Sequence, residues 1–300
     1  MERSVKEIIE SYEPKLQLAT ASTPPSTWYS DPRILELEQR TAFSRSWQLI
    51  TCTEQVRDPG KYISCEVAGE PIAVVKGNDR ILRGFFNVCR HHAAAVLTKS
   101  EGKTESLRCP YHGWTYDLTG ALIHTPEFAG VADFNRSANG LVSVQVAEWH
   151  NWIFARLEPI GPSLQEFLGS DLIERLEPLN LEHLHWFERR SYFLNCNWNV
   201  FVDNYLEGGY NVPHIHGGLS SALDNSKYKI EIGERFCLQS SPIASGKGEA
   251  QTAAVRQGER AYYFWIYPNF MINIYQSVMD TNLVIPRGVD KTEVVFDYYF

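Results

Sequence analysis

The chain has 300 residues, of which 44% are hydrophobic and 21% are charged, so it is long enough for two ordinary domains and too long for a small stapled scaffold. Its 28 basic and 36 acidic side chains give a net charge of −8, which argues against a nucleic-acid or membrane-surface binder. No run approaches the roughly 18 apolar residues of a membrane span, and the charged N-terminus has no apolar signal core. We therefore expect a cytoplasmic protein, or one of the plastid stroma if a transit peptide has been removed.

The predicted elements begin with a short helix, because Ser4 and Glu7 have the spacing of a capping box before a helical run of apolar residues. Residues 23–26 break this segment, and residues 34–46 again have helical periodicity, so residues 1–44 are taken as an N-terminal helical segment. From Lys61 the hydrophobic period changes to two residues, and a compact β domain is expected over residues 45–158. Its strands are predicted at 61–67, 71–76, 80–87, 104–108, 114–118, 121–125, 141–147 and 151–157.

A second domain is expected over residues 159–300. It opens with a helix, since Ser163 and Glu166 again have capping-box spacing. A further helix over 197–208 is predicted to end at Gly208 and Gly209. Strands of an antiparallel sheet are predicted at 188–194, 226–237, 260–276, 279–286 and 294–300. The predicted fold class is α+β: an all-β domain followed by a helix-plus-antiparallel-sheet domain, which we expect to be incomplete at its C-terminal end.

Two short segments of the β domain each hold one cysteine and one histidine. Cys89-Arg90-His91 is followed, after seventeen residues, by Cys109-Pro110-Tyr111-His112. Two such loops can place both thiolates on one iron and both imidazoles on the other, as a Rieske [2Fe–2S] centre requires. The alternative is a zinc site, which uses similar ligands but usually pairs Cys with Cys and His with His. We favour the iron–sulfur cluster, and the residues outside the ligand set are interpreted as a supporting or surface histidine, His92, and four reduced thiols, Cys52, Cys65, Cys196 and Cys237.

A second group of polar side chains lies in residues 203–216. With this stretch and the two cysteine–histidine segments, the chain resembles the Rieske non-haem iron oxygenases, specifically their choline monooxygenase-like branch, from about residue 12 onward. The matching stretches are residues 87–91, 109–113, 197–201, 203–210, 267–273 and 279–282. The resemblance implies a Rieske domain followed by a catalytic domain with a mononuclear Fe(II).

In this family two histidines, spaced His-x₄-His, and one carboxylate hold the mononuclear iron and leave positions open for O₂. The second histidine falls on His216, but the first falls on Asn211, whose amide oxygen is a weaker ligand for Fe(II) than imidazole. His214 is the alternative ligand, and a packing role is its competing interpretation. Five residues of a regular helix rotate by about 140°, so the pair can converge only where the helix is broken, and we expect Pro213 to break it. The carboxylate ligand is expected on a later helix, so we interpret the 300-residue chain as a fragment or a truncated product.

The resemblance also implies a role for Glu207. An acidic residue at this position links the cluster of one subunit to the iron of its neighbour, and the expected cluster residue is His112 of the partner subunit. Glu207 and Asn211 are four residues apart on one helix face and can touch. Asp203, one turn earlier, is a weaker candidate for the same network. A solvated helix carboxylate is the competing interpretation of Glu207.

The implied reaction is hydroxylation of an unactivated C–H bond with O₂, and the implied substrate is choline or a related quaternary ammonium compound, choline giving betaine aldehyde. The aromatic residues 262–265 and Tyr267 are candidates for a cation-binding cage, although at strand spacing they more often form core. No G-x-G-x-x-G follows a predicted strand, so electrons are expected from a separate ferredoxin or NAD(P)H-dependent reductase. A homotrimer is expected by resemblance. The alternatives are a Rieske electron carrier or regulatory relative that has lost its mononuclear iron, and a zinc-binding β module.

Overall fold

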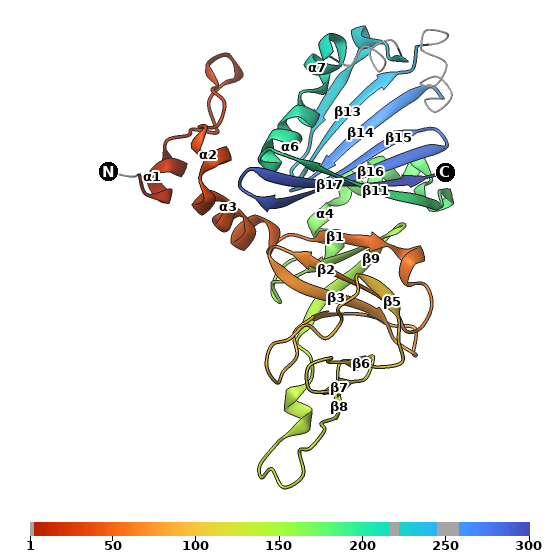
Figure 1. Cartoon of the computed structure of the whole chain (residues 1–300). Coiled ribbons are helices and arrows are strands. Elements are labelled where there is room, and N and C mark those ends of the chain that lie inside the picture. Colours follow the sequence, from red (N-terminus) through yellow and green to blue (C-terminus); the bar gives the residue numbers. More distant parts are fainter. Residues whose placement is uncertain (1–2, 216–221, 245–257) are drawn as a thin grey trace. The chain divides into compact units, whose positions relative to one another are not determined.

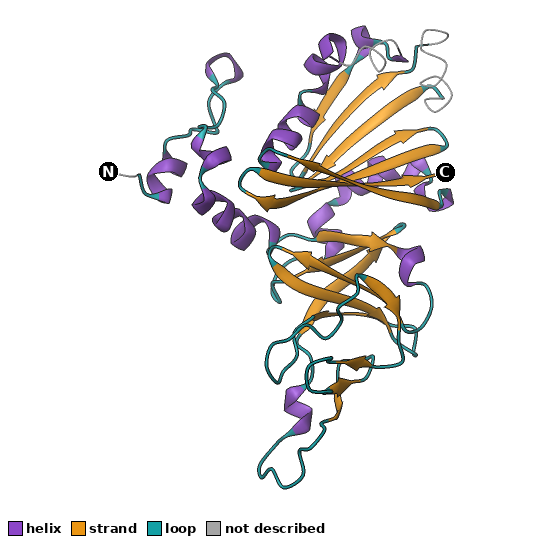
Figure 2. Cartoon of the chain, in the orientation of Figure 1, coloured by secondary structure: helices purple, strands orange, loops and turns teal. Residues whose placement is uncertain are grey.

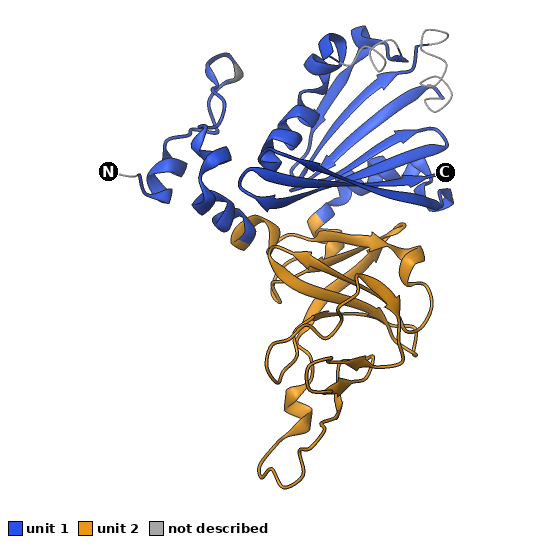
Figure 3. Ribbon diagram, viewed as in Figure 1, with its two compact units in different colours: residues 1–39, 168–300 blue, residues 40–167 orange. Residues whose placement is uncertain are grey.

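The computed structural model describes residues 3–215, 222–244 and 258–300. The chain forms two compact units (Figure 3). We call residues 40–167 the cluster unit, and residues 1–39 with 168–300 the sheet unit. Most of the segment expected at 1–44 therefore groups with the second half of the chain and does not stand alone. No helix among the described residues is long and apolar enough to cross a membrane.

The cluster unit is built from antiparallel strands (Figure 1). Its larger sheet has the order β1-β10-β9-β4-β3-β2-β5, and a small sheet has the order β6-β7-β8. Strand β2 begins and ends at the predicted residues, but β1 was not predicted, because all five of its residues are buried and no alternation marks them. The strands are β1 Gln48–Cys52, β2 Lys61–Val67, β3 Glu70–Lys76, β4 Leu82–Phe86, β5 Glu101–Lys103, β6 Leu107–Arg108, β7 Thr115–Tyr116, β8 Leu122–His124, β9 Ser143–Trp149 and β10 Trp152–Arg156.

The sheet unit holds one long antiparallel sheet of order β11-β17-β16-β15-β14-β13-β12 (Figure 2). Its strands are β11 Trp186–Leu194, β12 Lys229–Ile232, β13 Phe236–Pro242, β14 Arg260–Ile266, β15 Phe270–Tyr275, β16 Val278–Gly288 and β17 Lys291–Tyr299. Two predicted strands were wrong in extent. Residues 226–237 contain β12 and the start of β13, joined by a turn in which Gly233 N–H donates to Phe236 O. Residues 260–276 form the hairpin β14–β15, because Pro268 interrupts the run.

Short helices complete the chain. The capping boxes at Ser4 and Ser163 are both confirmed, since each serine hydroxyl and the glutamate three residues later exchange hydrogen bonds with the opposite backbone N–H. The expected helix over 34–46 is α3 followed by a π-helical turn, Gln39–Phe43. The helices are α1 Val5–Glu10, α2 Thr27–Ser30, α3 Pro32–Glu38, α4 Leu164–Leu168, α5 Ser170–Leu176, α6 Trp198–Leu206 and α7 Gly208–Ile215.

The N-terminal helices are tied to α6 by polar contacts. Tyr29 of α2 donates its hydroxyl to Asp203 Oδ2 at 2.6 Å. Glu38 of α3 accepts from Trp198 Nε1 at 2.8 Å and from Asn199 Nδ2 at 3.0 Å. These hydrogen bonds to α6 explain why the first 39 residues group with the sheet unit.

The break between α6 and α7 lies at Glu207, and the expectation that Pro213 breaks the helix was wrong. Glu207 has φ −82° and ψ 14°, whereas α7 runs through Pro213 to Ile215. A β-carbon on Gly208 would lie 2.6 Å from the Tyr228 hydroxyl and 2.7 Å from the Gln239 amide oxygen, so a larger residue there would displace the ends of these two side chains. The joint therefore lies where the chain passes close to Tyr228 and Gln239, and not at the proline.

Candidate metal centre and cavity

Two loops of the cluster unit share one backbone pattern. The first begins at Cys89 after β4 and the second at Cys109 after β6. In each loop the cysteine carbonyl accepts from the N–H four residues on, that of Ala93 at 3.0 Å and that of Gly113 at 3.1 Å. In each loop the cysteine N–H donates to the carbonyl five residues on, at 2.8 Å in both. Ala93 and Gly113 both have a left-handed backbone, with φ of +57° and +72°, so the two loops turn in the same way.

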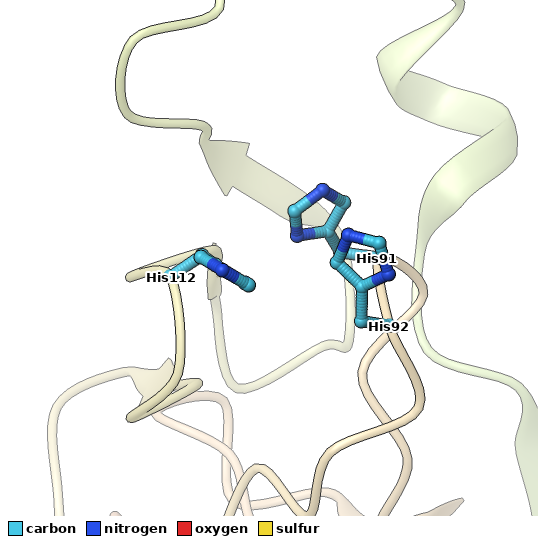
Figure 4. Close-up of side chains that lie close together, drawn as sticks. All are labelled: His91, His92 and His112. Carbon is cyan, nitrogen blue, oxygen red and sulfur yellow. The ribbon is translucent and has the colours of Figure 1, made fainter.

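The shared turns bring the four predicted cluster ligands together. The thiols of Cys89 and Cys109 are both buried in the same apolar core cluster. The imidazoles of His91 and His112 face one another from the two loops, with ring centroids 4.8 Å apart (Figure 4). One nitrogen from each of these and from exposed His92 lies within 4.8 Å of the others.

The chemistry of these side chains fits an iron–sulfur cluster. The Nδ1 atom of His91 is buried and has no hydrogen-bond partner within the described part of the chain. An orphaned polar atom of this kind is costly unless a ligand satisfies it, and a metal would. Burial, with the neighbouring rings of His92 and His112, lowers the pKa of His91 and so favours the neutral imidazole that ligates metals. Burial raises the pKa of the Cys109 thiol, so the thiol keeps its proton until a metal binds and displaces it.

Aromatic side chains pack against the ligand loops. The Trp114 ring stacks on His91, with centroids 4.8 Å apart and planes inclined by 8°. The Tyr116 hydroxyl lies 3.4 Å from the Sγ atom of Cys89 and accepts the Arg90 N–H at 3.0 Å. Burial and the neighbouring thiol raise the pKa of the Tyr116 hydroxyl, so it stays protonated beside the cysteine. Tyr116 was not singled out in the sequence.

The sheet unit has an open cavity of about 350 Å³, a size typical of small-molecule sites. Its walls come from α6, α7 and six strands of the long sheet, if the residue just before β12 is counted with that strand. The lining residues are Asn204, Tyr205, Gly208, Asn211, Val212, Tyr228, Gln239, Tyr263, Asn273, Tyr275, Asp280, Asn282 and Phe296. The sequence named the stretches 267–273 and 279–282, but of their residues it assigned only Tyr267 to a site, and Tyr267 does not line the cavity.

Strand register creates the polar wall of this cavity. Gln239 of β13 pairs with Tyr263 of β14, Tyr263 with Asn273 of β15, and Asn273 with Asp280 of β16. Directly opposite residues of antiparallel strands point to the same face, so the four side chains form one row across the sheet. Asn282 joins this face, because it lies two residues beyond Asp280.

Hydrogen bonds join the row to α6. The Asp280 carboxylate accepts from Asn273 Nδ2 at 2.6 Å and from Asn282 Nδ2 at 3.1 Å. The Tyr205 hydroxyl lies 2.8 Å from Asn273 Oδ1, and its backbone carbonyl accepts from Gln239 Nε2 at 2.8 Å. Burial, followed by the Asp280 charge, raises the pKa of Tyr205 well above its ordinary value. The wall is therefore a connected polar network that ends in one carboxylate.

Of the three candidate ligands of the mononuclear iron, one lines the cavity, one does not, and one lies outside the described residues. Asn211 lines the cavity, and its Nδ2 donates to Asn204 Oδ1 at 3.2 Å and to Glu207 Oε2 at 3.3 Å. The expected contact between Glu207 and Asn211 is therefore present. His214 is exposed, stacks on Tyr210 and has its Nδ1 2.7 Å from the Tyr210 carbonyl oxygen, and it does not line the cavity. The remaining candidate, His216, lies outside the described residues.

The aromatic run proposed for a cage contributes one residue. Tyr263 lines the cavity, whereas Phe264 is fully buried with its carbonyl oxygen 3.1 Å from the Tyr205 hydroxyl. Alternation along β14 sends neighbouring side chains to opposite faces, so the run cannot act as a unit. The other aromatic walls come from elements far apart in sequence, namely Tyr228, Tyr275 and Phe296.

Two family models match the chain. The model of the Rieske [2Fe-2S] domain matches residues 46–135, within the cluster unit. The model of the ring hydroxylating alpha subunit (catalytic domain) matches residues 181–300, within the sheet unit. Together these matches define the class of protein, a Rieske oxygenase alpha subunit, and they favour the iron–sulfur cluster over the zinc alternative.

The most informative similar proteins are monooxygenases of the Rieske class. Choline monooxygenase, chloroplastic, from Arabidopsis thaliana is 36% identical over 306 residues, a match that spans 98% of this chain and 72% of the relative. The carnitine monooxygenase oxygenase subunit of Escherichia coli (strain K12) is 29% identical, over 93% of this chain and 75% of the relative. The crystal structure of the quaternary ammonium Rieske monooxygenase CntA superposes with a TM-score of 0.83 and 26% identity, over 93% of this chain and 76% of that one. The chain belongs to the family of Rieske non-haem iron monooxygenases that includes choline and carnitine monooxygenases.

The two matched domains imply a Rieske [2Fe–2S] cluster and a mononuclear iron. The cluster fits the residues present, because the same two loops bury the thiols of Cys89 and Cys109 in one core and hold the imidazoles of His91 and His112 with ring centroids 4.8 Å apart. The mononuclear iron fits less well. Within the described ranges the cavity walls offer amide and carboxylate oxygens, from Asn211, Asp280 and their neighbours, and no imidazole. These residues do not fit a triad of two histidines and one carboxylate.

Proposed function

We propose that the protein oxidises choline to betaine aldehyde. Choline, O₂, two electrons and two protons would give the hydrated aldehyde and one water. The observation that carries this proposal is the cavity of the sheet unit, which sets the carboxylate of Asp280 among aromatic walls. A quaternary ammonium group is attracted both by a carboxylate and by aromatic faces, the latter by about 0.5–2 kcal/mol each.

The cluster of Cys89, His91, Cys109 and His112 would relay the electrons. Rieske oxygenases receive these from a ferredoxin or a reductase, and we propose a ferredoxin and an NAD(P)H-dependent reductase as the partners of this chain. We also propose a homotrimer in which Glu207 and, to a lesser extent, Asp203 connect the cluster of one subunit with the catalytic cavity of the next. The proposed location is the cytoplasm or the plastid stroma.

Oxygen uptake tests the proposed function. The protein with ferredoxin, reductase and NADPH is expected to consume O₂ when choline is added and to form betaine aldehyde in equal amount. The variant Cys109→Ser is the control for electron flow and is expected to consume none. Uptake without betaine aldehyde, or no uptake with a fully loaded cluster, would reject choline oxidation.

One observation favours a second candidate, an electron-transfer or regulatory relative without a mononuclear iron. Asn211 occupies the position where the family has a histidine, and its amide is tied to Asn204 and Glu207. Iron analysis separates the two candidates: about three irons per chain for the oxygenase and about two for the carrier. The variant Asn211→His is expected to raise iron content above the wild-type value, whereas Asn211→Ala is not. An unchanged content in Asn211→His would show that this position does not bind iron.

A further inference from the structure

Three aromatic rings lie together against one of the cluster ligands. Trp114 follows the second ligand loop, but its ring stacks on His91 of the first loop, with centroids 4.8 Å apart and planes inclined by 8°. The rings of Phe128 and Phe134 both meet Trp114 edge to face, with centroids at 5.6 Å and 5.7 Å. They also meet each other, at 4.6 Å. We call Trp114, Phe128 and Phe134 the aromatic clamp.

The two phenylalanines come from the connection between β8 and β9, residues 125–142, which supplies none of the four cluster ligands. Before the phenylalanines, Pro126 lies beside the second ligand loop, since a β-carbon on Gly113 would meet its Cγ atom at 3.1 Å. After them, the Arg136 guanidinium donates to the Ile123 carbonyl of β8 at 3.3 Å. The connection is therefore held on both sides of the rings that it places on Trp114.

The clamp forms the apolar part of the surroundings of His91. Trp114 is 4% exposed and belongs to the same apolar core cluster as the two ligand cysteines, with both phenylalanines packed against that cluster. The other two rings that contact His91, those of His92 and His112, are exposed. The Nδ1 atom of His91 is buried and has no hydrogen-bond partner in the described ranges, so ring stacking orients the imidazole there.

We propose that the aromatic clamp positions His91 and, by keeping water from that side of the cluster, holds its reduction potential below that of an open site. Reduction adds one electron and therefore one negative charge, which water stabilises better than an apolar wall. The apolar shell of a metal site controls its potential in this way. Phe128 and Phe134 are positioning residues, since they act through Trp114. The inference goes beyond the proposed function, because it holds whichever substrate is oxidised.

Redox titration of the intact, cluster-loaded protein tests the proposal. Dithionite is the reductant, mediator dyes carry the electrons, and visible absorption reports the reduced fraction. Trp114→Leu removes the stacked ring and is expected to favour the reduced cluster about tenfold, a rise in potential of about 59 mV for a one-electron couple. Trp114→Phe keeps a ring that can stack and is expected to stay within about threefold of the wild type. The g-values of the reduced cluster should change in Trp114→Leu alone, because the His91 plane is no longer fixed.

A double variant of the connection separates positioning from a merely structural role. Phe128→Leu with Phe134→Leu keeps all four ligands, Trp114 and the apolar character of the connection. It is expected to raise the potential in the same direction, favouring the reduced cluster about threefold. The matched control is Trp149→Leu, which removes a tryptophan of β9 in the same unit and is expected to leave potential and g-values unchanged. Trp149 also contacts three rings, those of His150, Trp152 and Phe154.

An unchanged or lowered potential in cluster-loaded Trp114→Leu overturns the proposal, and so does an equal rise in Trp149→Leu. If Trp114→Leu takes up no cluster, the double variant decides, since an unchanged potential there with full iron content overturns the proposal. None of these measurements needs choline or O₂. A protein that shows the expected shifts and does not oxidise choline would therefore retain this inference and lose the proposed function.

Discussion

Cys109 lies in the core of the cluster unit, where 2% of its surface is exposed, and its neighbours are apolar side chains and the second ligand thiol. We expect Cys109→Ser to lose about two irons per chain and the visible absorption of the thiolate–iron bonds, because the hydroxyl is a poor ligand for the cluster. Metal analysis and an absorption spectrum of anaerobically purified protein check this.

The matched control is Cys65→Ser, which changes a half-buried thiol of β2 in the same unit. It should keep full iron content. A coloured Cys109→Ser protein with two irons would contradict the assignment of the loop.

The candidate cluster ligands could be recognised in the sequence because each pair lies within one turn. Cys89 and His91, or Cys109 and His112, are at most three residues apart, so local spacing fixes their chemistry. The cavity could not be predicted in the same way. Asp280 meets Asn273 only through the register of two strands, and register depends on turn length and bulges that the hydrophobic pattern does not contain.

At the scale of elements, the joint between α6 and α7 depends on Gly208. We expect Gly208→Ala to lower the free energy of unfolding by about 1–3 kcal/mol, because the added methyl group would displace Tyr228 and the Gln239 amide from the cavity wall. Denaturant unfolding measures this change.

Gly209→Ala is the matched control, since a β-carbon there meets its nearest neighbour at 3.4 Å. Alanine is also the better helix former, so this variant should be neutral or slightly stabilising. Equal destabilisation by both variants would show that the contact with the sheet does not fix the joint.

The contact of α2 with α6 makes stability depend on pH. Burial, and then the Glu207 charge, raise the pKa of Asp203 above its ordinary value of 3.8, while the Tyr29 hydrogen bond lowers it. A raised native pKa means that the folded state binds the proton more tightly, so the free energy of unfolding falls as pH rises above 3.8. Tyr29→Phe should extend this fall to higher pH, and Asp203→Asn should remove it.

Urea unfolding at several pH values between 4 and 7, roughly the window above the ordinary carboxyl pKa, measures both effects. Parallel curves for the wild type and the two variants would contradict this account of the contact.

Most strands and both capping boxes were predicted because their signals are local, but the exceptions share a cause. The uniformly buried β1 shows no alternation, and the joint at Glu207 is set by Tyr228 and Gln239, which come much later in the chain. The sequence pattern alone predicts a break at Pro213. The contact of Gly208 with Tyr228 and Gln239 is known only once the fold is known. Long-range contacts therefore decide the features that local patterns leave undefined.

At the scale of the whole molecule, the proposed electron route requires a second subunit. Glu207 is exposed on the single chain, and its Oε2 accepts from Asn211 Nδ2. Its carboxylate can therefore contact a second subunit while it stays bound to a residue of the cavity wall. We expect Glu207→Gln to lower choline-dependent O₂ uptake at least about tenfold by removing a charged hydrogen-bond partner. The rate at which the reductase reduces the cluster should not change.

Glu174→Gln, an exposed position on α5, is the control and should leave both rates unchanged. Stopped-flow reduction of the cluster and oxygen uptake are the two measurements. Loss of both rates in Glu207→Gln, or of neither, would exclude the proposed route.

The matched backbone turns at Cys89 and Cys109 bear on how the protein matures in a cell. Main-chain hydrogen bonds close both loops over an apolar core, so the chain itself supplies part of the energy that shapes them. In a zinc finger, by contrast, metal binding supplies the folding energy. The scaffold is therefore expected to form first and to accept an iron–sulfur cluster that has been assembled elsewhere. A shortage of iron would then leave a pool of folded, colourless protein that can be refilled, and not unfolded chains destined for proteolysis.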